Sequence, residues 1–478
     1  MSARAIKHLS VEDRKARGKG ARDQTALSGH ADWTPAAERP DPVALLEAQN
    51  ATREQDLVPV RHGRMLVSPF TFYRGAAKIM AADLKDTPRA GLTVQLCGDA
   101  HLSNFGVFAS PERTLLFDLN DFDETLPGPF EYDVKRMAAS FTIAARNNGF
   151  TRAQTHDVTL ASVRNYRESM AGFAQMRTMD IWYARLPEEE IMSALAASVA
   201  SQKDKAKRKE AAKGAKAAQK FTLKARTRDS LQALSKLAEH VDGNYRIVSQ
   251  PPIVIPVREL AAFSALSPGE VQHTIHEQFR AYRSTLQDDR RHLLEHFEVI
   301  DVARKVVGVG SVGTRAFIVL LQGRDQEDPL FLQVKEATTS VLEDHLPKSR
   351  YKQHGERVVQ GQRMMQAASD IYLGWTKGVE ANRWLYWRQL RDMKGSLEVE
   401  TMNPLGLEFY ARQCGWTLAR AHARSGDAVA IAGYLGKSDT FDRSITDFSE
   451  RYADQNEEDY RAFTEAVRSG RLAAVEGV

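Results

Sequence analysis

Between residues 315 and 335 the pattern of apolar and polar positions predicts two strands joined by a turn. Arg315–Leu321 is the first strand-like run, Gly323–Pro329 is rich in turn-forming residues, and Leu330–Lys335 is the second run. Successive side chains of a strand point to opposite faces, so Lys335 and Val334 lie on different faces. The pattern therefore predicts a hairpin whose last lysine reaches a cleft while its neighbours pack.

Further along, the pattern predicts a helix, a strand and another helix. Composition favours a helix over Lys348–Ile371, and the apolar run Trp384–Leu390 favours a strand. Asn403 and Pro404 begin the next helix, because Asn is a preferred cap and Pro suits the first helical position. Ser425-Gly426 ends this helix. Its apolar residues recur at helical spacing: Leu407, Tyr410, Cys414, Leu418 and Ala421.

Two earlier segments concentrate acidic and amide side chains beside a strand-like apolar run. The first is Cys97–Gly106, with Asp99 and Asn104, and the second is Thr114–Glu124, with several aspartates. Magnesium is usually held by one or two carboxylates together with phosphate oxygens. We therefore expect a divalent metal and a phosphate here. The alternative is that both segments are turns that cap strand ends, because Asp and Asn are favoured in turns.

The first segment resembles the Gly-Asp-x-His-x-x-Asn loop of the aminoglycoside phosphotransferase and choline kinase branch of the protein-kinase-like superfamily. The resemblance implies that Asp99 orients a hydroxyl nucleophile and that Asn104 binds magnesium. In that branch a second metal-binding Asp follows, and about a dozen residues later an Asp-Leu-Ala-like motif opens a helix. Asp121 fits this spacing, because Asp133 lies twelve residues later. Asp118 is the rival metal ligand, because the more apolar strand immediately precedes it.

A glycine-rich stretch precedes the predicted hairpin. Val307–Thr314 places Gly308, Gly310 and Gly313 in a GxGxxG arrangement, which lets a backbone approach phosphates closely. A lone GxGxxG is a weak signal. A strand rather than a helix follows these glycines, which argues against a dinucleotide site.

The glycine stretch and the hairpin together resemble the glycine loop and the Val-Ala-Ile-Lys strand of kinases. The resemblance implies that the loop, including Ser311, and Lys335 bind the phosphates of ATP. Kinases pair this lysine with a glutamate from the following helix, so Glu356 is the expected partner and Glu343 the second candidate. The alternatives are a solvated edge lysine and solvated helix glutamates.

The loops that resemble the catalytic and metal loops precede the glycine loop and the lysine strand in this chain, whereas they follow them in kinases. Leu418–His422 also resembles the Leu-Ala-x-Leu-His helix that precedes the catalytic loop in aminoglycoside phosphotransferases, yet it lies near the C-terminus. A circular permutation explains this order, and domains tolerate one when the original termini lie close together at the surface. The predicted fold is α+β: a two-lobed, circularly permuted protein-kinase-like fold with a small antiparallel sheet lobe and a larger helical lobe.

Four regions are expected along the 478 residues, a length that favours two lobes over one core. Residues 1–55 are predicted to be a mobile N-terminal arm, because the first forty carry scattered Arg and Lys without an apolar core. Residues 56–295 hold the catalytic and metal loops with a helical lobe, and 296–400 form the nucleotide lobe. Residues 401–478 are a returning helical segment of the large lobe.

From further motifs the chain is identified as a member of a bacterial family of uncharacterised proteins, domain of unknown function 2252. The match covers roughly residues 55–460. The motifs are Ser68–Gly75, Gly98–Asp123, Arg357–Arg363 and Arg388–Gly395. The family carries no assigned substrate, so membership indicates architecture more than reaction.

Composition is ordinary for a soluble globular protein, with 42% hydrophobic and 27% charged residues. The net charge of +4 is too small to imply nucleic acid as a partner. The basic, Ala-rich run Gln202–Lys220 predicts an exposed helix, with an acidic partner as the alternative. No uncharged apolar stretch approaches transmembrane length, so no membrane is expected as a partner.

The two cysteines, Cys97 and Cys414, form no disulfide framework, and the N-terminus lacks a secretory signal. A reduced, cytoplasmic location is therefore expected. Cys97 is expected to be a small core residue rather than a nucleophile. The sequence does not indicate an oligomeric state.

The expected function is ATP- and Mg²⁺-dependent phosphoryl transfer to a hydroxyl of an unknown small molecule or protein. Asp99, His101 and Asn104 would form the catalytic loop, with His101 bracing it. Arg64 and Arg74 would either meet an acidic substrate group or form structural ion pairs. The alternatives are a nucleotide-binding pseudokinase, a nucleotidyl transferase and a metal-dependent phosphatase. The phosphatase is less favoured, because it needs clustered metal ligands and the histidines here are scattered.

Overall fold

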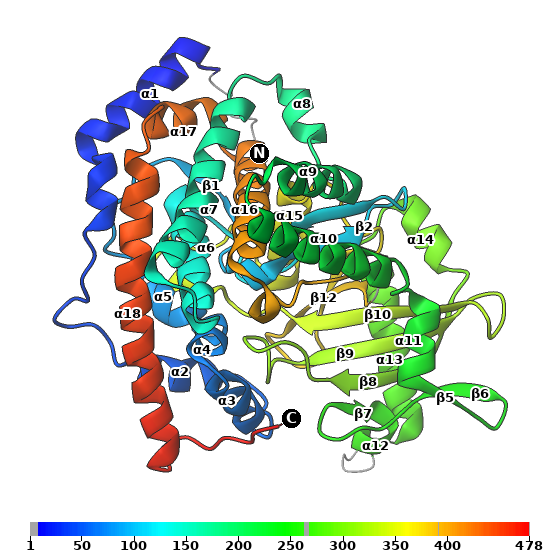
Figure 1. Cartoon of the computed structure of the whole chain (residues 1–478). Coiled ribbons are helices and arrows are strands. Elements are labelled where there is room, and N and C mark those ends of the chain that lie inside the picture. Colours follow the sequence, from blue (N-terminus) through cyan, green and yellow to red (C-terminus); the bar gives the residue numbers. More distant parts are fainter. Residues whose placement is uncertain (1–7, 262–266, 391, 478) are drawn as a thin grey trace.

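The computed structural model describes residues 8–261, 267–390 and 392–477, which form a mixed α+β protein (Figure 1). Within these residues, a six-stranded antiparallel sheet has the order β11-β12-β10-β9-β8-β7, and helices dominate the rest. The strands of this sheet are β7 Val254–Pro256, β8 Glu298–Lys305, β9 Ala316–Gln322, β10 Pro329–Glu336, β11 Gly374–Lys377 and β12 Trp384–Gln389. Two-stranded antiparallel pairs are β1 Thr93–Leu96 with β4 Leu126–Pro129, β2 Phe105–Ala109 with β3 Leu115–Leu119, and β5 Ala238–Val241 with β6 Asn244–Ile247.

The helices fall into groups along the chain. Those before the first strand are α1 Val11–Gln24, α2 Pro42–Asn50, α3 Val58–Leu66, α4 Pro69–Gly75 and α5 Ala77–Leu84. The helical body consists of α6 Phe130–Asn147, α7 Arg152–Phe173, α16 Pro404–Ser425, α17 Ala428–Leu435 and α18 Thr440–Arg468. The others are α8 Thr178–Tyr183, α9 Glu188–Ser201, α10 Lys205–Arg226, α11 Ser230–Leu237, α12 Val257–Ala261, α13 Pro268–Arg283, α14 Asp288–Leu294 and α15 His354–Met365. Short 3₁₀ helices are η1 Leu27–Ala31, η2 Leu102–Asn104, η3 Val341–Asp344 and η4 Val399–Thr401.

The predicted hairpin is confirmed as β9 and β10, in the middle of the larger sheet. On the other side of β10, strand β12 places Tyr386 opposite Lys335. Val334 packs on one face in an apolar cluster with α13, and Phe331 packs on the other face with α11. Apolar side chains therefore cover both faces of the central strands, and Lys335 is positioned at the end of a rigid strand.

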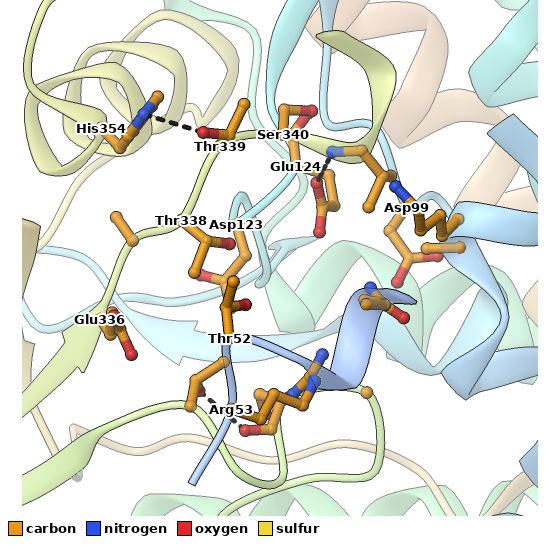
Figure 2. Close-up of a pocket in the computed structure, with 18 of the residues that line it drawn as sticks. Thr52, Arg53, Asp99, Asp123, Glu124, Glu336, Thr338, Thr339, Ser340 and His354 are labelled. Carbon is orange, nitrogen blue, oxygen red and sulfur yellow. Dashed lines mark hydrogen bonds between the residues drawn. The ribbon is translucent and has the colours of Figure 1, made fainter. Parts of the chain in front are cut away.

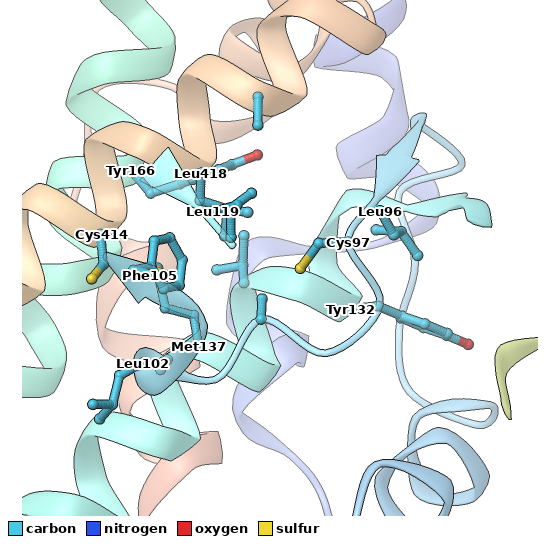
Figure 3. Close-up of a cluster of buried hydrophobic side chains, with 14 of the residues drawn as sticks. Leu96, Cys97, Leu102, Phe105, Leu119, Tyr132, Met137, Tyr166, Cys414 and Leu418 are labelled. Carbon is cyan, nitrogen blue, oxygen red and sulfur yellow. The ribbon is translucent and has the colours of Figure 1, made fainter. Parts of the chain in front are cut away.

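Helix α6 is the centre of the helical body and is buried along nearly its whole length. It packs against α7 and α18, and α16 packs against α7 (Figure 1). Figure 3 shows the apolar core around this helix, where Cys97 and Cys414 lie among Leu102, Phe105 and Leu418. Both cysteines are buried and unbridged, and burial raises the thiol pKa of each well above its usual range. The expectation that Cys97 is a core residue is therefore confirmed.

Local predictions are mostly confirmed, with one correction to a helix boundary. Helices α10 and α16 and strand β12 occur where the sequence predicts them, and the Asn403 side chain caps α16. The helix predicted over 348–371 is shorter, because α15 begins at His354 and ends at Met365. The amide of Ala367 donates to the carboxylate of Asp118 (2.8 Å) rather than to a helix carbonyl. A tertiary hydrogen bond therefore ends the helix.

The described part of the predicted N-terminal arm is folded, which contradicts the expectation of mobility; residues 1–7 lie outside the described residues. Helix α1 packs along α17 (Figure 1). Gly18 allows this contact, because a Cβ there would lie 1.9 Å from the carbonyl oxygen of Ala430. Arg22 donates to the Tyr434 carbonyl (2.6 Å), and Trp33 packs against Tyr452. The segment docks through arginine hydrogen bonds and a close backbone approach, which leave no apolar periodicity in the sequence.

The buried His30 predicts a loss of stability in mild acid. Its Nε2 lies 2.7 Å from the Tyr434 hydroxyl, and burial, followed by the charge of Lys135, lowers its pKa from 6.5 to about 3. The unfolded chain therefore binds this proton first, and the free energy of unfolding decreases as the pH falls below about 6.5. Between pH 6.5 and 5 the loss due to His30 should be about 2 kcal/mol.

The His30→Gln variant keeps a polar partner for Tyr434 and should flatten this part of the profile, as measured by urea denaturation between about pH 5 and 7.5. The exposed His8 offers a matched control, because His8→Gln should leave the acid-dependent loss unchanged. An identical slope in the wild-type and His30→Gln proteins would contradict the assignment.

Candidate functional site

A cavity of about 670 Å³ lies where several distant segments meet. Figure 2 shows Asp99 on one side of the cavity and Glu336 and His354 on the other, with Asp123 and Arg53 in between. Four segments contribute to the wall: the 99–104 loop, the 121–124 loop, the glycine stretch at 308–314, and the chain at 336–344. The sequence predicts three of these as functional segments, and the structure brings all three to one cavity.

Asp99 follows β1 and is held by an arginine from α6. Its Oδ1 accepts a hydrogen bond from Arg136 Nε (2.8 Å), while the guanidinium of Arg136 lies 3.8 Å from the centre of the Tyr73 ring. Burial raises the pKa of Asp99, and the charge of Arg136 opposes this rise. The carboxylate is therefore fixed in orientation while it still lines the cavity.

His101 and Asn104 shape the loop that carries Asp99. Asn104 Nδ2 and the amide of His101 both donate to the Asp99 carbonyl, each at 2.8 Å. The His101 ring lies 3.7 Å from Asp99, and its pKa is well below the usual range because of burial and the nearby Arg74 and Arg136. A neutral, buried ring of this kind suits a bracing role.

A buried network beneath the loop supports its backbone. The carboxylate of Asp133, at the start of α6, accepts from the amides of Cys97 (2.8 Å) and Gly98 (3.0 Å). The same carboxylate lies 3.3 Å from His422 Nε2 of α16, and the other nitrogen of that ring lies 2.8 Å from the Tyr166 hydroxyl. Two motifs that the sequence places far apart, at Asp133 and at His422, thus meet under the catalytic loop.

Lys335 makes the central contact of the acidic loop. Its Nζ lies 2.5 Å from Asp123 Oδ2 and 3.9 Å from Asp121 Oδ1, and it is 2% exposed. The Tyr386 hydroxyl donates to the other Asp123 oxygen at 2.6 Å. Burial alone would raise the pKa of Asp123, but the charge and hydrogen bond of Lys335 outweigh it, and the pKa is lowered. Burial and the charge of Asp123 raise the pKa of Asp121.

The ion pair predicted between Lys335 and a helix glutamate is wrong. Within the described residues, Lys335 pairs with the aspartates of the acidic loop, and Glu356 is not among the cavity-lining residues. The second candidate, Glu343, lies 3.9 Å from Arg357 instead. Lys335 itself is not among the cavity-lining residues, whereas its partner Asp123 is.

The structure separates the two candidate metal aspartates. Asp118 is 1% exposed, forms an ion pair with Arg420 of α16 and accepts from the amides of Leu119 and Ala367. It is absent from the cavity wall, so its proposed role as a metal ligand is contradicted. Asp121 lines the cavity with a side chain that is 34% exposed. The motif alone could not make this choice, because the partner of Asp118 lies three hundred residues away in sequence.

The glycine stretch connects β8 to β9 and covers one side of the cavity. Gly308, Gly310 and Ser311 line the space, and Gly308 and Gly313 adopt positive φ angles that favour glycine. Gly313 does not line the cavity, because it packs against Arg53. The predicted loop is thus present, with one of its three glycines used for packing.

One wall of the cavity is formed by residues that no sequence motif assigned to a nucleotide site. Residues from α2 to α5 contribute to it: Ala48, Gln49, Thr52, Arg53, Arg74, Gly75, Ala77 and Lys78. This wall holds the glycine stretch, because Arg64 donates to the Gly308 carbonyl (2.5 Å) and the Glu54 amide to the Gly313 carbonyl (2.7 Å). In the sequence, the Ser68–Gly75 motif, which includes α4, indicated part of this wall.

The residues present fit a magnesium ion bound together with phosphates. Asn104 and Asp121 both line the cavity, and Nδ2 of Asn104 is used by Asp99, which leaves its Oδ1 without a hydrogen bond in the described structure. Burial and then the charge of the neighbouring Asp123 raise the pKa of Asp121, and a cation bound there would favour the ionised carboxylate. Across the described ranges, no group of three His, Cys, Asp or Glu side chains is arranged to hold a metal ion.

Fold and site define a mixed α+β protein whose cavity, lined by both carboxylates and basic side chains, lies between the glycine stretch and the helix-supported 99–104 loop. Residues 53–466 match the family model described as an uncharacterised protein conserved in bacteria, DUF2252. The chain therefore belongs to the DUF2252 family. No curated protein and no solved structure matches the chain. Among residues 8–261, 267–390 and 392–477, no helix is both long enough and apolar enough to cross a membrane.

The buried pair predicts a large effect of removing Lys335. Lys335→Met leaves Asp123 without its cation, and because the Asp123 side chain is 26% exposed, the loss of unfolding free energy should lie near the lower end of the roughly 3–5 kcal/mol that breaking a fully buried pair costs. Adding Asp123→Asn removes the orphaned charge, so the double variant should recover much of the loss in urea denaturation. Lys78→Met serves as the control and should cost less than about 1 kcal/mol, because its partner Asp344 is half exposed. Equal losses for Lys78→Met and Lys335→Met would contradict the central role of this pair.

Proposed function

We propose that this protein is an ATP- and Mg²⁺-dependent phosphotransferase that acts on a hydroxyl of a small molecule or protein. One observation carries the proposal: Asp99, Asp121 and Gly308–Ser311 line one cavity although they lie far apart in sequence. A phosphoryl transfer site needs these three functions within reach of a single triphosphate. The proposal would be contradicted if these three segments lay on opposite sides of the molecule.

The residues take distinct roles in this proposal. Asp99, fixed by Arg136, orients the acceptor hydroxyl and accepts its proton. Asn104 and Asp121 would hold magnesium, which when bound neutralises charge on the transferring phosphate. The amides of the glycine stretch lie against the phosphates, and Lys335 holds Asp123 and Asp121 in place. Catalysis would come from positioning and electrostatics rather than from a covalent intermediate.

The proposed fold is a two-lobed, circularly permuted protein-kinase-like arrangement. Three features support it: a glycine stretch between two antiparallel strands, a lysine on the following strand, and a catalytic loop carried by helices. The carboxylate of Asp133 and the ring of His422 meet beneath the catalytic loop, and this contact supports a late helix in the position that the unpermuted order would need. The order of segments along the chain does not impede catalysis, which depends on spatial assembly.

One observation favours a second candidate, a nucleotide-binding protein without phosphoryl transfer or with nucleotidyl transfer. Lys335 is engaged by two aspartates and does not line the cavity, so its contact with a phosphate needs a rearrangement. The same ligands could hold a nucleotide in the inverted direction. A metal-dependent phosphatase receives no support from the described ligand geometry.

The first expected outcome concerns nucleotide binding. ATP with magnesium should raise the thermal unfolding temperature, because a ligand at 100 times its Kd stabilises the native state by about 2.7 kcal/mol. Lys335→Ala should abolish the shift, and Asp121→Asn should remove its magnesium-dependent part. Asp344→Asn, a change on the same wall, should keep the full shift. The absence of a shift with any nucleotide would count against both candidates.

The second expected outcome separates chemistry from binding. Asp99→Asn should reduce ATP consumption in the presence of a metabolite pool by about 100- to 10,000-fold, while ATP binding changes little. Because burial raises the pKa of Asp99, the acidic limb of the rate profile should lie above that of an exposed carboxylate. Mass spectrometry of the product distinguishes a transferred phosphoryl group from a nucleotidyl group. Equal loss of binding and turnover would contradict the role of Asp99.

A further inference from the structure

Two arginines on the N-terminal wall of the cavity have no acidic partner. Within the described residues, Arg53 makes one side-chain hydrogen bond, to the Val312 carbonyl (2.5 Å), and the Arg74 side chain makes none. Neither forms an ion pair in that part of the chain, and both Nε atoms are buried without a hydrogen-bond partner. These two guanidinium groups therefore border the cavity without a direct ion pair in the described residues.

Two other cations that line the cavity have acidic partners. Arg383 lies 2.7 Å from Glu336 and 3.5 Å from Glu380, and Lys78 lies 2.5 Å from Asp344. A buried or half-buried charge without a partner is costly, so an unpaired guanidinium that faces a cavity is typical of an anion site. The cost is visible here, because burial lowers the pKa of Arg53 to about 10 and also lowers that of Arg74.

The two arginines flank the glycine stretch. A Cβ at Gly313 would lie 3.1 Å from the Arg53 side chain, and a Cβ at Gly310 would lie 3.0 Å from the Arg74 carbonyl oxygen. Glu400 and then Asp99 act electrostatically on Arg74, whereas Glu124, Glu336 and Asp123 act on Arg53. Arg74 therefore lies toward the catalytic loop, and Arg53 lies toward the acidic loop and β10.

The wall behind these side chains is rigid. The fully buried Arg61 donates to the Gly75 carbonyl (2.8 Å) and to the Asn50 side chain (2.8 Å), which ties α3 to α4 and to α2. Arg61 also lacks an acidic partner in the described structure, so it adds positive potential behind the cavity. The positions of Arg53 and Arg74 are thus set by the fold.

We infer that Arg53 and Arg74 form a phosphate subsite that binds the anionic part of the substrate in place of the enclosed Lys335. A phosphate group offers several oxygens to the paired N–H donors of a guanidinium, so it fits these donors better than an anion with a single acceptor atom does. The phosphate comes either from the end of the nucleotide's chain or from an anionic group on the acceptor. The identity of the ligand rests on the proposed function, whereas phosphate binding itself can be tested alone.

Tripolyphosphate with magnesium is the probe for this subsite, and isothermal titration calorimetry on the full-length protein is the measurement. Arg53→Gln and Arg74→Gln should each weaken binding at least about 10-fold, because each removes charge-assisted hydrogen bonds. Arg383→Gln is the matched control, because Arg383 also lines the cavity but has acidic partners, and it should change the Kd for tripolyphosphate less than about 3-fold. Arg74→Lys should recover part of the affinity, because it restores the charge but not the paired donors.

Ligand-free thermal unfolding checks that each variant is folded, and a variant that fails this check is replaced by its lysine counterpart.

The source of the phosphate follows from two further titrations. A larger effect of Arg74→Gln on ATP than on ADP assigns the subsite to the terminal phosphate. An effect on inorganic phosphate in the presence of saturating ADP, without an effect on ATP, assigns it to the acceptor.

The inference is overturned if wild-type protein binds neither tripolyphosphate nor phosphate with ADP, or if all three glutamine variants weaken binding equally. Its failure is distinct from failure of the proposed function. Strong tripolyphosphate binding that needs both arginines, without any ATP consumption, would keep the subsite and reject the phosphotransferase. ATP turnover that is unchanged in Arg53→Gln and Arg74→Gln would keep the phosphotransferase and reject the subsite.

Discussion

The buried ion pair between Lys335 and Asp123 is the constraint on which the cavity depends. It joins residues 212 positions apart, one on a central strand of the sheet and one on a loop of the helical side. Arg357 strengthens the same seam, because it donates to the carbonyls of Asp123, Thr125 and Thr338. Ser340 and the Val341 amide complete the seam through Glu124. Because Lys335 is 2% exposed and the Asp123 side chain is 26% exposed, the pair forms only when the two parts of the chain are correctly docked.

Two sides of the cavity carry charges of opposite sign. Asp99 and the acidic loop supply carboxylates, and the wall formed by α2 to α5 supplies Arg53 and Arg74. Helices of the body set the carboxylates, since Arg136 fixes Asp99 and the Asp133 carboxylate fixes the loop backbone. A preorganised separation of charge in a partly enclosed space acts more strongly on a ligand than it would in water. A ligand that carries phosphates and a divalent cation would match both sides.

The sequence predicts features that depend on local periodicity and short motifs, and it misses those that depend on distant partners. The hairpin around Lys335 and the helix from Pro404 follow from alternation and capping, which are local. The partner of Lys335 does not, because Asp123 and Glu356 have the same chemistry and only docking decides between them. Asp118 is similar: its burial against Arg420 cannot be read from either segment. The N-terminal segment escaped prediction because glycine and arginine contacts dock it.

Under the proposed function, the charge balance around the acidic loop favours a metal that arrives together with phosphates. Asp121 and Asp123 contribute two negative charges, and Lys335 and Arg388 act on both with two positive charges. The cluster is therefore nearly neutral as it stands, so a bare divalent cation would give the cluster itself a net positive charge. A metal already bound to a triphosphate brings its own negative charge, which the free Arg53 and Arg74 can meet. Under the proposed function, the two sides of the cavity thus favour one composite ligand over either of its parts alone.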